Sequence, residues 1–162
     1  MAFTFSPNKE SLKRMFAVYA VVAKGAHDTK LHVGKSGDNN DGCNPLISRC
    51  GDHFSYNKMH SSAISLKIVR NVITRMFSIT STITPKENAK RRVCIDKINE
   101  LERWLNQSIQ RLVHGKKNVV LLNPFFAAAY ISKAERGKRV AFRIPEIGEK
   151  IEAIVKAVGA GI

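Results

Sequence analysis

The sequence predicts an α+β domain in which helices flank a small, largely antiparallel sheet. Short apolar runs rich in β-branched and aromatic residues, such as "FAVYAVVA" at 16–23, are typical of buried strands. Between them lie stretches with an apolar residue every three or four positions, which is the pattern of amphipathic helices. The chain has 162 residues, 44% of them hydrophobic, so we expect a single domain with one core over residues 1–162.

A predicted hairpin is the main feature of the first half of the chain. A short helix, capped by Ser6 and opened by Pro7, is expected before the hairpin. "FAVYAVVA" is the first strand, "KGAHDT" the turn, and "KLHV" at 30–33 the returning strand. A loop dense in Gly, Asn and Asp then leads to a second predicted helix, with Asn44 as its cap and Pro45 in its first turn.

Two more elements precede the longest helix. The spacing of Ile64, Ile68 and Val72 predicts a basic helix over 61–75, and the β-branched, alternating "MFSITSTI" predicts a strand over 76–83. The sequence "TPKE" at 84–87 then forms a capping box that starts a long helix. Gly115 ends this helix, whose buried stripe is expected to contain Ile98, Leu101, Leu105, Ile109 and Leu112.

The remaining segments form a C-terminal strand and helix extension. We expect a strand "NVVLL" at 118–122, a short helix from Pro124 and a basic strand "KRVAFRI" at 138–144. A final helix starts at Pro145. Its inward positions are Ile147, Ile151, Ile154, Val155 and Val158.

The charge of the chain predicts a polyanionic partner. Lys and Arg number 27 against 13 Asp and Glu, giving a net charge of +14. The chain contains no apolar run of membrane-spanning length and its start lacks the layout of a secretory signal, so we expect nucleic acid rather than a membrane as the partner. Three cysteines, an odd number, favour a reducing, cytoplasmic location over a disulfide framework.

The tripeptide Gly34-Lys35-Ser36 matches the last three residues of a phosphate-binding loop, but the residues before it exclude such a loop. Such a loop needs glycine five positions before the second glycine, where this chain has Thr29. The intervening "KLHV" is itself strand-like. We therefore do not expect this tripeptide to bind a nucleoside triphosphate.

The hairpin motifs resemble those of the GIY-YIG nuclease family. "VYA" at 18–20 is similar to the first signature and "HVGKSG" at 32–37 to the second, with His32 where the family has tyrosine. Arg49 and His53 follow at R-x-x-x-H spacing, and "LERWL" at 101–105 is similar to the helix that bears the family's catalytic glutamate. The resemblance covers about residues 16–110, which leaves 111–162 as an extension. It implies a small nuclease with a three-stranded antiparallel sheet that cuts DNA with one divalent metal.

The resemblance also implies roles for particular residues. Tyr19 or His32 would activate the attacking water, since either side chain can hydrogen-bond to it and histidine can accept a proton near neutral pH. Arg49 would contact the scissile phosphate, with His53 one helical turn away. A carboxylate would hold Mg²⁺ or Mn²⁺. Glu102 is the first choice, because it flanks the apolar stripe, and Glu87 is the second.

Cations on several segments are expected to bind the DNA backbone. Lys35 lies just beyond the returning strand, beside the predicted site. The others belong to the basic helix over 61–75 and the basic strand over 138–144; they are Lys67, Arg70, Arg75, Lys138, Arg139 and Arg143.

Two other functions are compatible with the sequence. A non-catalytic nucleic-acid-binding module on a degenerate nuclease scaffold explains the charge equally well. A structural interaction protein would bind its partner with little dependence on salt. A zinc site at Cys43, Cys50, His53 and Cys94 is disfavoured, because the spacings do not match paired C-x₂-C motifs. Cutting both DNA strands with one active site per chain would favour a homodimer.

Overall fold

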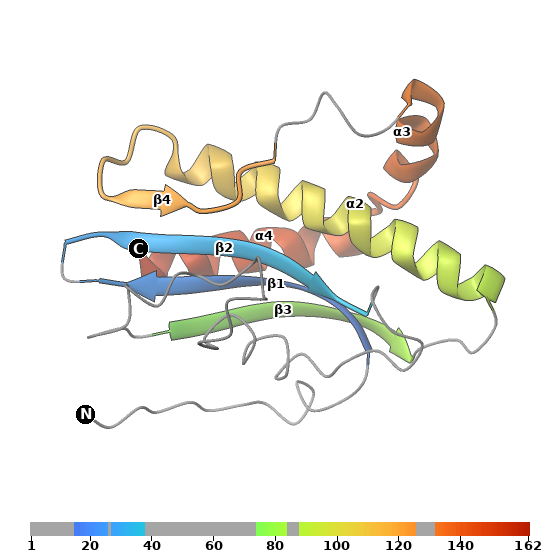
Figure 1. Ribbon diagram of the computed structural model, residues 1–162, viewed down its shortest axis with the longest axis horizontal. Coiled ribbons are helices and arrows are strands. Elements are labelled where there is room, and N and C mark those ends of the chain that lie inside the picture. The colour runs from blue at the N-terminus through green and yellow to red at the C-terminus, as the bar shows by residue number, and fades with distance from the viewer. Residues whose placement is uncertain (1–14, 26, 38–73, 84–87, 126–131) are drawn as a thin grey trace, which may run out of the picture.

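The computed structural model describes residues 15–25, 27–37, 74–83, 88–125 and 132–162. They form an α+β arrangement in which helices pack on a sheet with strand order β3-β1-β2-β4 (Figure 1). In chain order the elements are β1 (Met15–Lys24), β2 (Thr29–Ser36), β3 (Thr74–Ile83), α2 (Asn88–Val113), β4 (Val119–Leu121), α3 (Lys133–Val140) and α4 (Pro145–Gly161).

The predicted hairpin is confirmed. β1 pairs antiparallel with β2, with Ala20 opposite Val33, and the Gly25 N–H donates to the Asp28 carbonyl at 2.7 Å in the turn. β2 continues to Ser36, so Gly34-Lys35-Ser36 lies within a paired strand. A strand cannot turn consecutive amides toward one phosphate, which agrees with excluding a nucleotide-binding loop.

β3 lies on the other side of β1, antiparallel to it. It begins at Thr74, so the predicted helix over 61–75 was wrong at its end: Arg75 is in the strand, opposite Val22. Pairing with β1 extends the strand beyond the local β-branched run. The rest of that predicted helix and those starting at Ser6 and Asn44 fall outside the described residues.

The sheet is mixed rather than three-stranded and antiparallel, because a fourth strand joins it. The predicted strand at 118–122 is present as β4, which pairs parallel with Thr29–Leu31 of β2. Hydrogen bonds from Thr29 N–H to the Asn118 carbonyl and from Leu122 N–H to the Leu31 carbonyl, both 2.8 Å, flank this pairing. The long helix α2 supplies the crossover that a parallel strand requires.

One face of the sheet packs against α2 and α4 (Figure 1). Alternate residues of β1 point to these helices, because side chains alternate along a strand. This core contains Phe16, Val18, Ala20 and Val22 of β1 with Leu31 and Val33 of β2. The predicted stripe of α2 is buried at Ile98, Leu101, Leu105 and Ile109, and Leu112 is partly buried.

The final helix also agrees with the sequence prediction. α4 starts at Pro145 and buries Ile147, Ile151, Ile154 and Val158, while Val155 is partly buried. Across the described ranges, the helices lack the combination of length and apolar character that crossing a bilayer requires.

The predicted basic strand over 138–144 was wrong. Residues up to Val140 belong to α3, and a turn connects it to α4. The Ser132 hydroxyl accepts a hydrogen bond from the Glu135 N–H at 3.1 Å, and Glu135 pairs with Arg139 one turn later at 2.9 Å. These local helix signals outweigh the β-branched "RVAFRI" pattern. Pro124 and Phe125 are not helical, and 126–131 lie outside the described residues.

Candidate functional site

Tyr19 and His32 lie side by side on the face of the sheet opposite α2. They come from neighbouring strands, and their ring centroids are 6.4 Å apart with the planes tilted by 41°. Tyr19 is only 1% exposed. The two residues predicted to activate water are therefore neighbours, although their motifs are separate in the sequence.

Gly34 allows the Tyr19 ring to lie across β2. The two residues are direct cross-strand partners. A Cβ added at Gly34 would lie 2.6 Å from both Cζ and Oη of Tyr19, far inside van der Waals contact. The glycine of "HVG" is therefore required for close approach of the ring.

Replacing Gly34 by Ala is expected to destabilise the protein by about 1–3 kcal/mol, because the Tyr19 ring must shift within a packed region. Urea unfolding followed by circular dichroism measures this. Gly137→Ala is the matched control, since nothing lies within 4 Å of its added Cβ in α3 and alanine favours a helix. Equal stability of Gly34→Ala and the parent would contradict the requirement.

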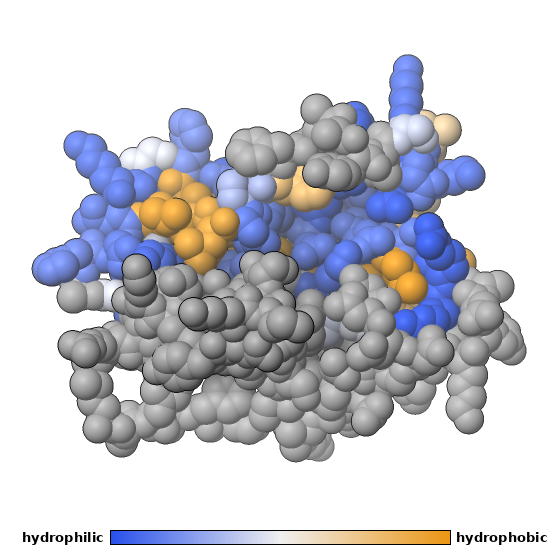
Figure 2. All heavy atoms as spheres, in the orientation of Figure 1, coloured by the Kyte–Doolittle hydropathy of each residue, from blue (hydrophilic) through white to orange (hydrophobic). Residues whose placement is uncertain are grey.

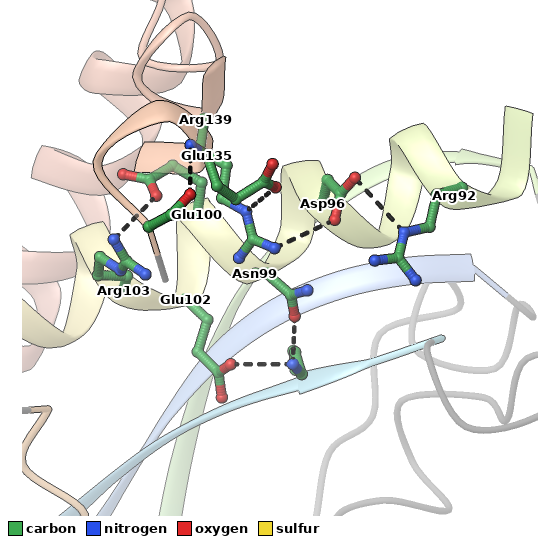
Figure 3. Close-up of polar contacts among 10 residues, drawn as sticks. Arg92, Asp96, Asn99, Glu100, Glu102, Arg103, Glu135 and Arg139 are labelled. Carbon is green, nitrogen blue, oxygen red and sulfur yellow. Dashed lines mark hydrogen bonds and ion pairs between the residues drawn. The ribbon is translucent and has the colours of Figure 1, made fainter. Parts of the chain in front are cut away.

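Lys35 and Glu102 form the second part of the candidate site. The Lys35 ammonium lies 3.4 Å from a Glu102 carboxylate oxygen and also donates to the side-chain oxygen of Asn99. Figure 3 shows Asn99 and Glu102 projecting from α2 toward the sheet. About a quarter of each charged side chain is exposed, 24% for Lys35 and 27% for Glu102. The pair is thus partly desolvated but reachable by a ligand.

The two parts lie on opposite faces of the sheet. Lys35 continues the alternation of Leu31 and Val33 toward α2, whereas His32 points to the face of Tyr19. β4 pairs with β2 only as far as Leu31. The sheet therefore separates the residues predicted to activate water from those predicted to bind phosphate and metal, and the structure does not bring all four side chains into one site.

The residues around Glu102 fit a hydrated Mg²⁺. This ion prefers hard oxygen ligands, keeps several waters and needs only one or two carboxylates. Glu102 supplies a carboxylate, and the Asn99 amide oxygen shares with it the Lys35 ammonium as partner. Groups of three or more His, Cys, Asp or Glu that could hold a metal are absent from the described residues. Of the proposed zinc ligands, only Cys94 is described, and it is half-buried with a free thiol.

Two asparagines hold β2 beyond the end of β4, and the sequence analysis assigned no role to one of them, Asn106. The Asn123 side chain accepts from Val33 N–H at 3.1 Å and donates to the Val33 carbonyl at 2.6 Å, so it takes the place of one residue of a paired strand. Asn106, 3% exposed on α2, donates to the Asn123 carbonyl at 2.8 Å and accepts from Phe125 N–H at 3.0 Å. Asn106 follows Glu102 by one helical turn, and Val33 precedes Lys35 by two residues. A polar residue beside the apolar stripe of α2 was the available signal.

Asn123→Ala is expected to cost about 1–3 kcal/mol of unfolding free energy, because the Val33 amide and carbonyl lose their partners. Chemical denaturation measures the loss. Asn118→Ala provides the control: its carbonyl bonds to Thr29 through the backbone, and its side chain is exposed. A drop of similar size in both variants would argue against the specific role of Asn123.

A buried ionic cluster lies on the side of α2 away from the sheet (Figure 3). Glu100 is only 1% exposed. It pairs with Arg143 at 2.7 Å and with Arg103 at 3.7 Å. Arg139 pairs with Asp96 at 3.3 Å and with Glu135 at 2.9 Å. Arg139 and Arg143, predicted to bind DNA, are thus engaged in joining α3 and the following turn to α2.

Arg103 is the most enclosed cation of this cluster. Its side chain is 7% exposed, and its guanidinium stacks 4.9 Å from the centre of the Phe125 ring. Burial lowers the pKa of the Arg103 guanidinium, Glu100 opposes this shift, and Arg139, Arg136 and Arg143 add to it. The single Glu100 carboxylate therefore stabilises several crowded positive charges.

The remaining predicted site residues divide into two groups. Lys138 is exposed on α3, and Arg75 is known only as part of β3. Three cations, one histidine and the second-choice metal ligand fall outside the described residues; they are Arg49, Lys67, Arg70, His53 and Glu87. The described part of the candidate site therefore consists of Lys35, Asn99 and Glu102, and Tyr19 and His32 form a separate pair on the other face of the sheet. Comparison with protein-family models, with curated proteins and with solved structures gives no match to this chain.

Proposed function

We propose that this protein is a metal-dependent DNA endonuclease of the GIY-YIG type. The observation that carries the proposal is the contact between Lys35 and Glu102 at 3.4 Å. The sequence predicted Lys35 of the hairpin as a phosphate contact and Glu102 of the long helix as a metal ligand. These two residues lie far apart in the sequence, so their contact in the structure favours a shared site over coincidence.

The pair has the chemistry that phosphodiester hydrolysis requires. The Lys35 ammonium can stabilise negative charge that develops on a phosphate oxygen, and a partly desolvated position strengthens this effect. The Glu102 carboxylate, with the Asn99 amide oxygen nearby, would hold Mg²⁺. When bound, this ion would supply Lewis-acid stabilisation of the phosphate and its leaving oxygen.

The hairpin residues predicted to activate water, Tyr19 and His32, lie on the face of the sheet opposite Lys35 and Glu102. We therefore do not assign either of them as the base for a phosphate bound beside Lys35 and Glu102. Arg49 and His53 complete the proposed set, with Arg49 on the scissile phosphate. The net charge of +14 supports a polyanionic substrate. Cleavage of both strands of a duplex would use two copies of the chain.

Incubation with DNA in Mg²⁺ or EDTA tests the proposal. Unmodified plasmid, phage DNA and branched duplexes serve as substrates, and Arg49→Ala is run in parallel. We expect cleavage that requires Mg²⁺ and is lost in the variant. DNA that is retarded on a gel but left intact under all these conditions would overturn the proposal in favour of a non-catalytic binding module.

A further inference from the structure

α3 is held on α2 by buried and partly buried charges. Arg139 lies between Asp96 of α2 and Glu135 of α3, with 13% of its side chain exposed. After α3, Arg143 donates from Nε to Glu100 at 2.8 Å, and its guanidinium lies over the Trp104 ring at 5.4 Å from the ring centre. These contacts fix both the position and the orientation of a helix that buries no residue of its own.

The charged side chains that are fully exposed on α3 are all cations. Glu135, the acidic residue of this helix, is half-buried and neutralises Arg139. Lys133, Arg136 and Lys138 are exposed, and none forms an ion pair with another residue of the described ranges. At about 100° per residue, Arg136 and Lys138 flank the side that bears Glu135 and Arg139, and Lys133 points away from it. Figure 2 shows long hydrophilic side chains projecting where α3 lies.

We propose that Lys133, Arg136 and Lys138, here called the α3 basic surface, dock the phosphate backbone of nucleic acid outside the cleavage site. This inference rests on the proposed function for the identity of the partner. Flexible cations on a rigid helix can each neutralise one phosphate and release counterions, without reading the bases. The ionic cluster thus holds the α3 basic surface in position. Arg139 and Arg143 contribute to nucleic-acid binding by holding α3 in place and do not themselves contact the phosphates.

The α3 basic surface and the candidate site lie on different sides of α2. Asn99 and Glu102 project toward the sheet, whereas Glu100 and Arg139 lie on the side of α3 (Figure 3). Changes to the α3 basic surface should therefore weaken binding without altering the chemistry at Glu102.

Binding of a short fluorescent duplex, measured by anisotropy in EDTA, tests this without requiring cleavage. The variant Lys133→Gln/Arg136→Gln/Lys138→Gln is expected to bind at least about tenfold more weakly at 0.1 M salt. Its log–log dependence on salt, between about 50 and 200 mM, should be shallower by about 2 to 3. The matched control, Lys116→Gln/Lys150→Gln/Lys156→Gln, removes the same charge from exposed positions elsewhere and should keep the parent slope.

Two further measurements complete the test. Lys133→Arg/Lys138→Arg keeps the charge and should retain parent binding, and circular dichroism should show all variants folded. Equal weakening of both triple variants would overturn the proposal, because net charge would then explain the binding. The proposal would also be overturned if Lys133→Gln/Arg136→Gln/Lys138→Gln bound DNA like the parent but lost binding to vesicles of phosphatidylserine and phosphatidylcholine. A selective loss of DNA binding supports the α3 basic surface even if no cleavage is ever detected, so its outcome and that of the nuclease test are separable.

Discussion

Glu102→Gln is expected to reduce Mg²⁺-dependent DNA cleavage at least about 100-fold while leaving folding and DNA binding near those of the parent. Glutamine keeps the size of the side chain and can still accept a hydrogen bond from Lys35. It removes the negative charge that would hold the metal. Initial rates of plasmid nicking, measured over a range of Mg²⁺ concentrations, provide the readout.

Lys35→Met should reduce Mg²⁺-dependent cleavage by a similar factor for a different reason, since it removes the cation that would stabilise the phosphate. If both residues belong to one site, the double variant should lose little more than either single one. The ion pair is partly exposed, so its removal should cost less than about 1 kcal/mol of stability. Glu152→Gln, on the exposed side of α4, controls for the loss of one negative charge. Parent-like cleavage by Glu102→Gln would exclude this residue as the metal ligand.

Glu100→Gln is expected to destabilise the fold by about 3–5 kcal/mol, more than the losses expected for Gly34→Ala and Asn123→Ala. The carboxylate is buried and faces Arg143 and Arg103 at 2.7 and 3.7 Å. A neutral amide would leave both guanidinium groups in a poorly solvated region without a counter-charge. Urea unfolding gives the stability change, and limited proteolysis reports whether α3 has separated from α2.

Two comparisons make this prediction specific to the buried charge. Glu149→Gln, an exposed position on α4, should change stability by less than about 0.5 kcal/mol. Adding Arg143→Met to Glu100→Gln should restore part of the loss, because it removes one of the buried cations. Indistinguishable stabilities of the parent and Glu100→Gln would mean that the cluster does not hold α3 in place.

Local patterns were sufficient wherever one segment carried its own signal. The run at 16–23 and the turn at Gly25 and Asp28 predicted the β1–β2 hairpin, and apolar spacing predicted the inner faces of α2 and α4. The α3 segment carried conflicting signals. Its cap at Ser132 and its Glu135–Arg139 pair favoured a helix, and Arg139 is further held by Asp96, 43 positions away.

The candidate site was predictable as a set of residues but not as an arrangement. Motif order and chemistry selected Tyr19, His32, Lys35 and Glu102, and the structure pairs the first two and the last two. Nothing local indicated that the Asn123 side chain would complete the edge of β2, because its partner Val33 is 90 positions away.

By itself, the sequence determined the hairpin, the amphipathic helices, the basic character of the chain and the exclusion of a nucleotide-binding loop. These follow from backbone preferences, side-chain periodicity and charge, which act over a few residues or by composition alone. Only the tertiary structure decided that the sheet is mixed, that Glu100 is buried while Glu102 meets Lys35, and that Arg139 and Arg143 support α3. Each of these depends on which distant segments pack together, because packing determines whether a charged side chain is solvated or buried against an opposite charge.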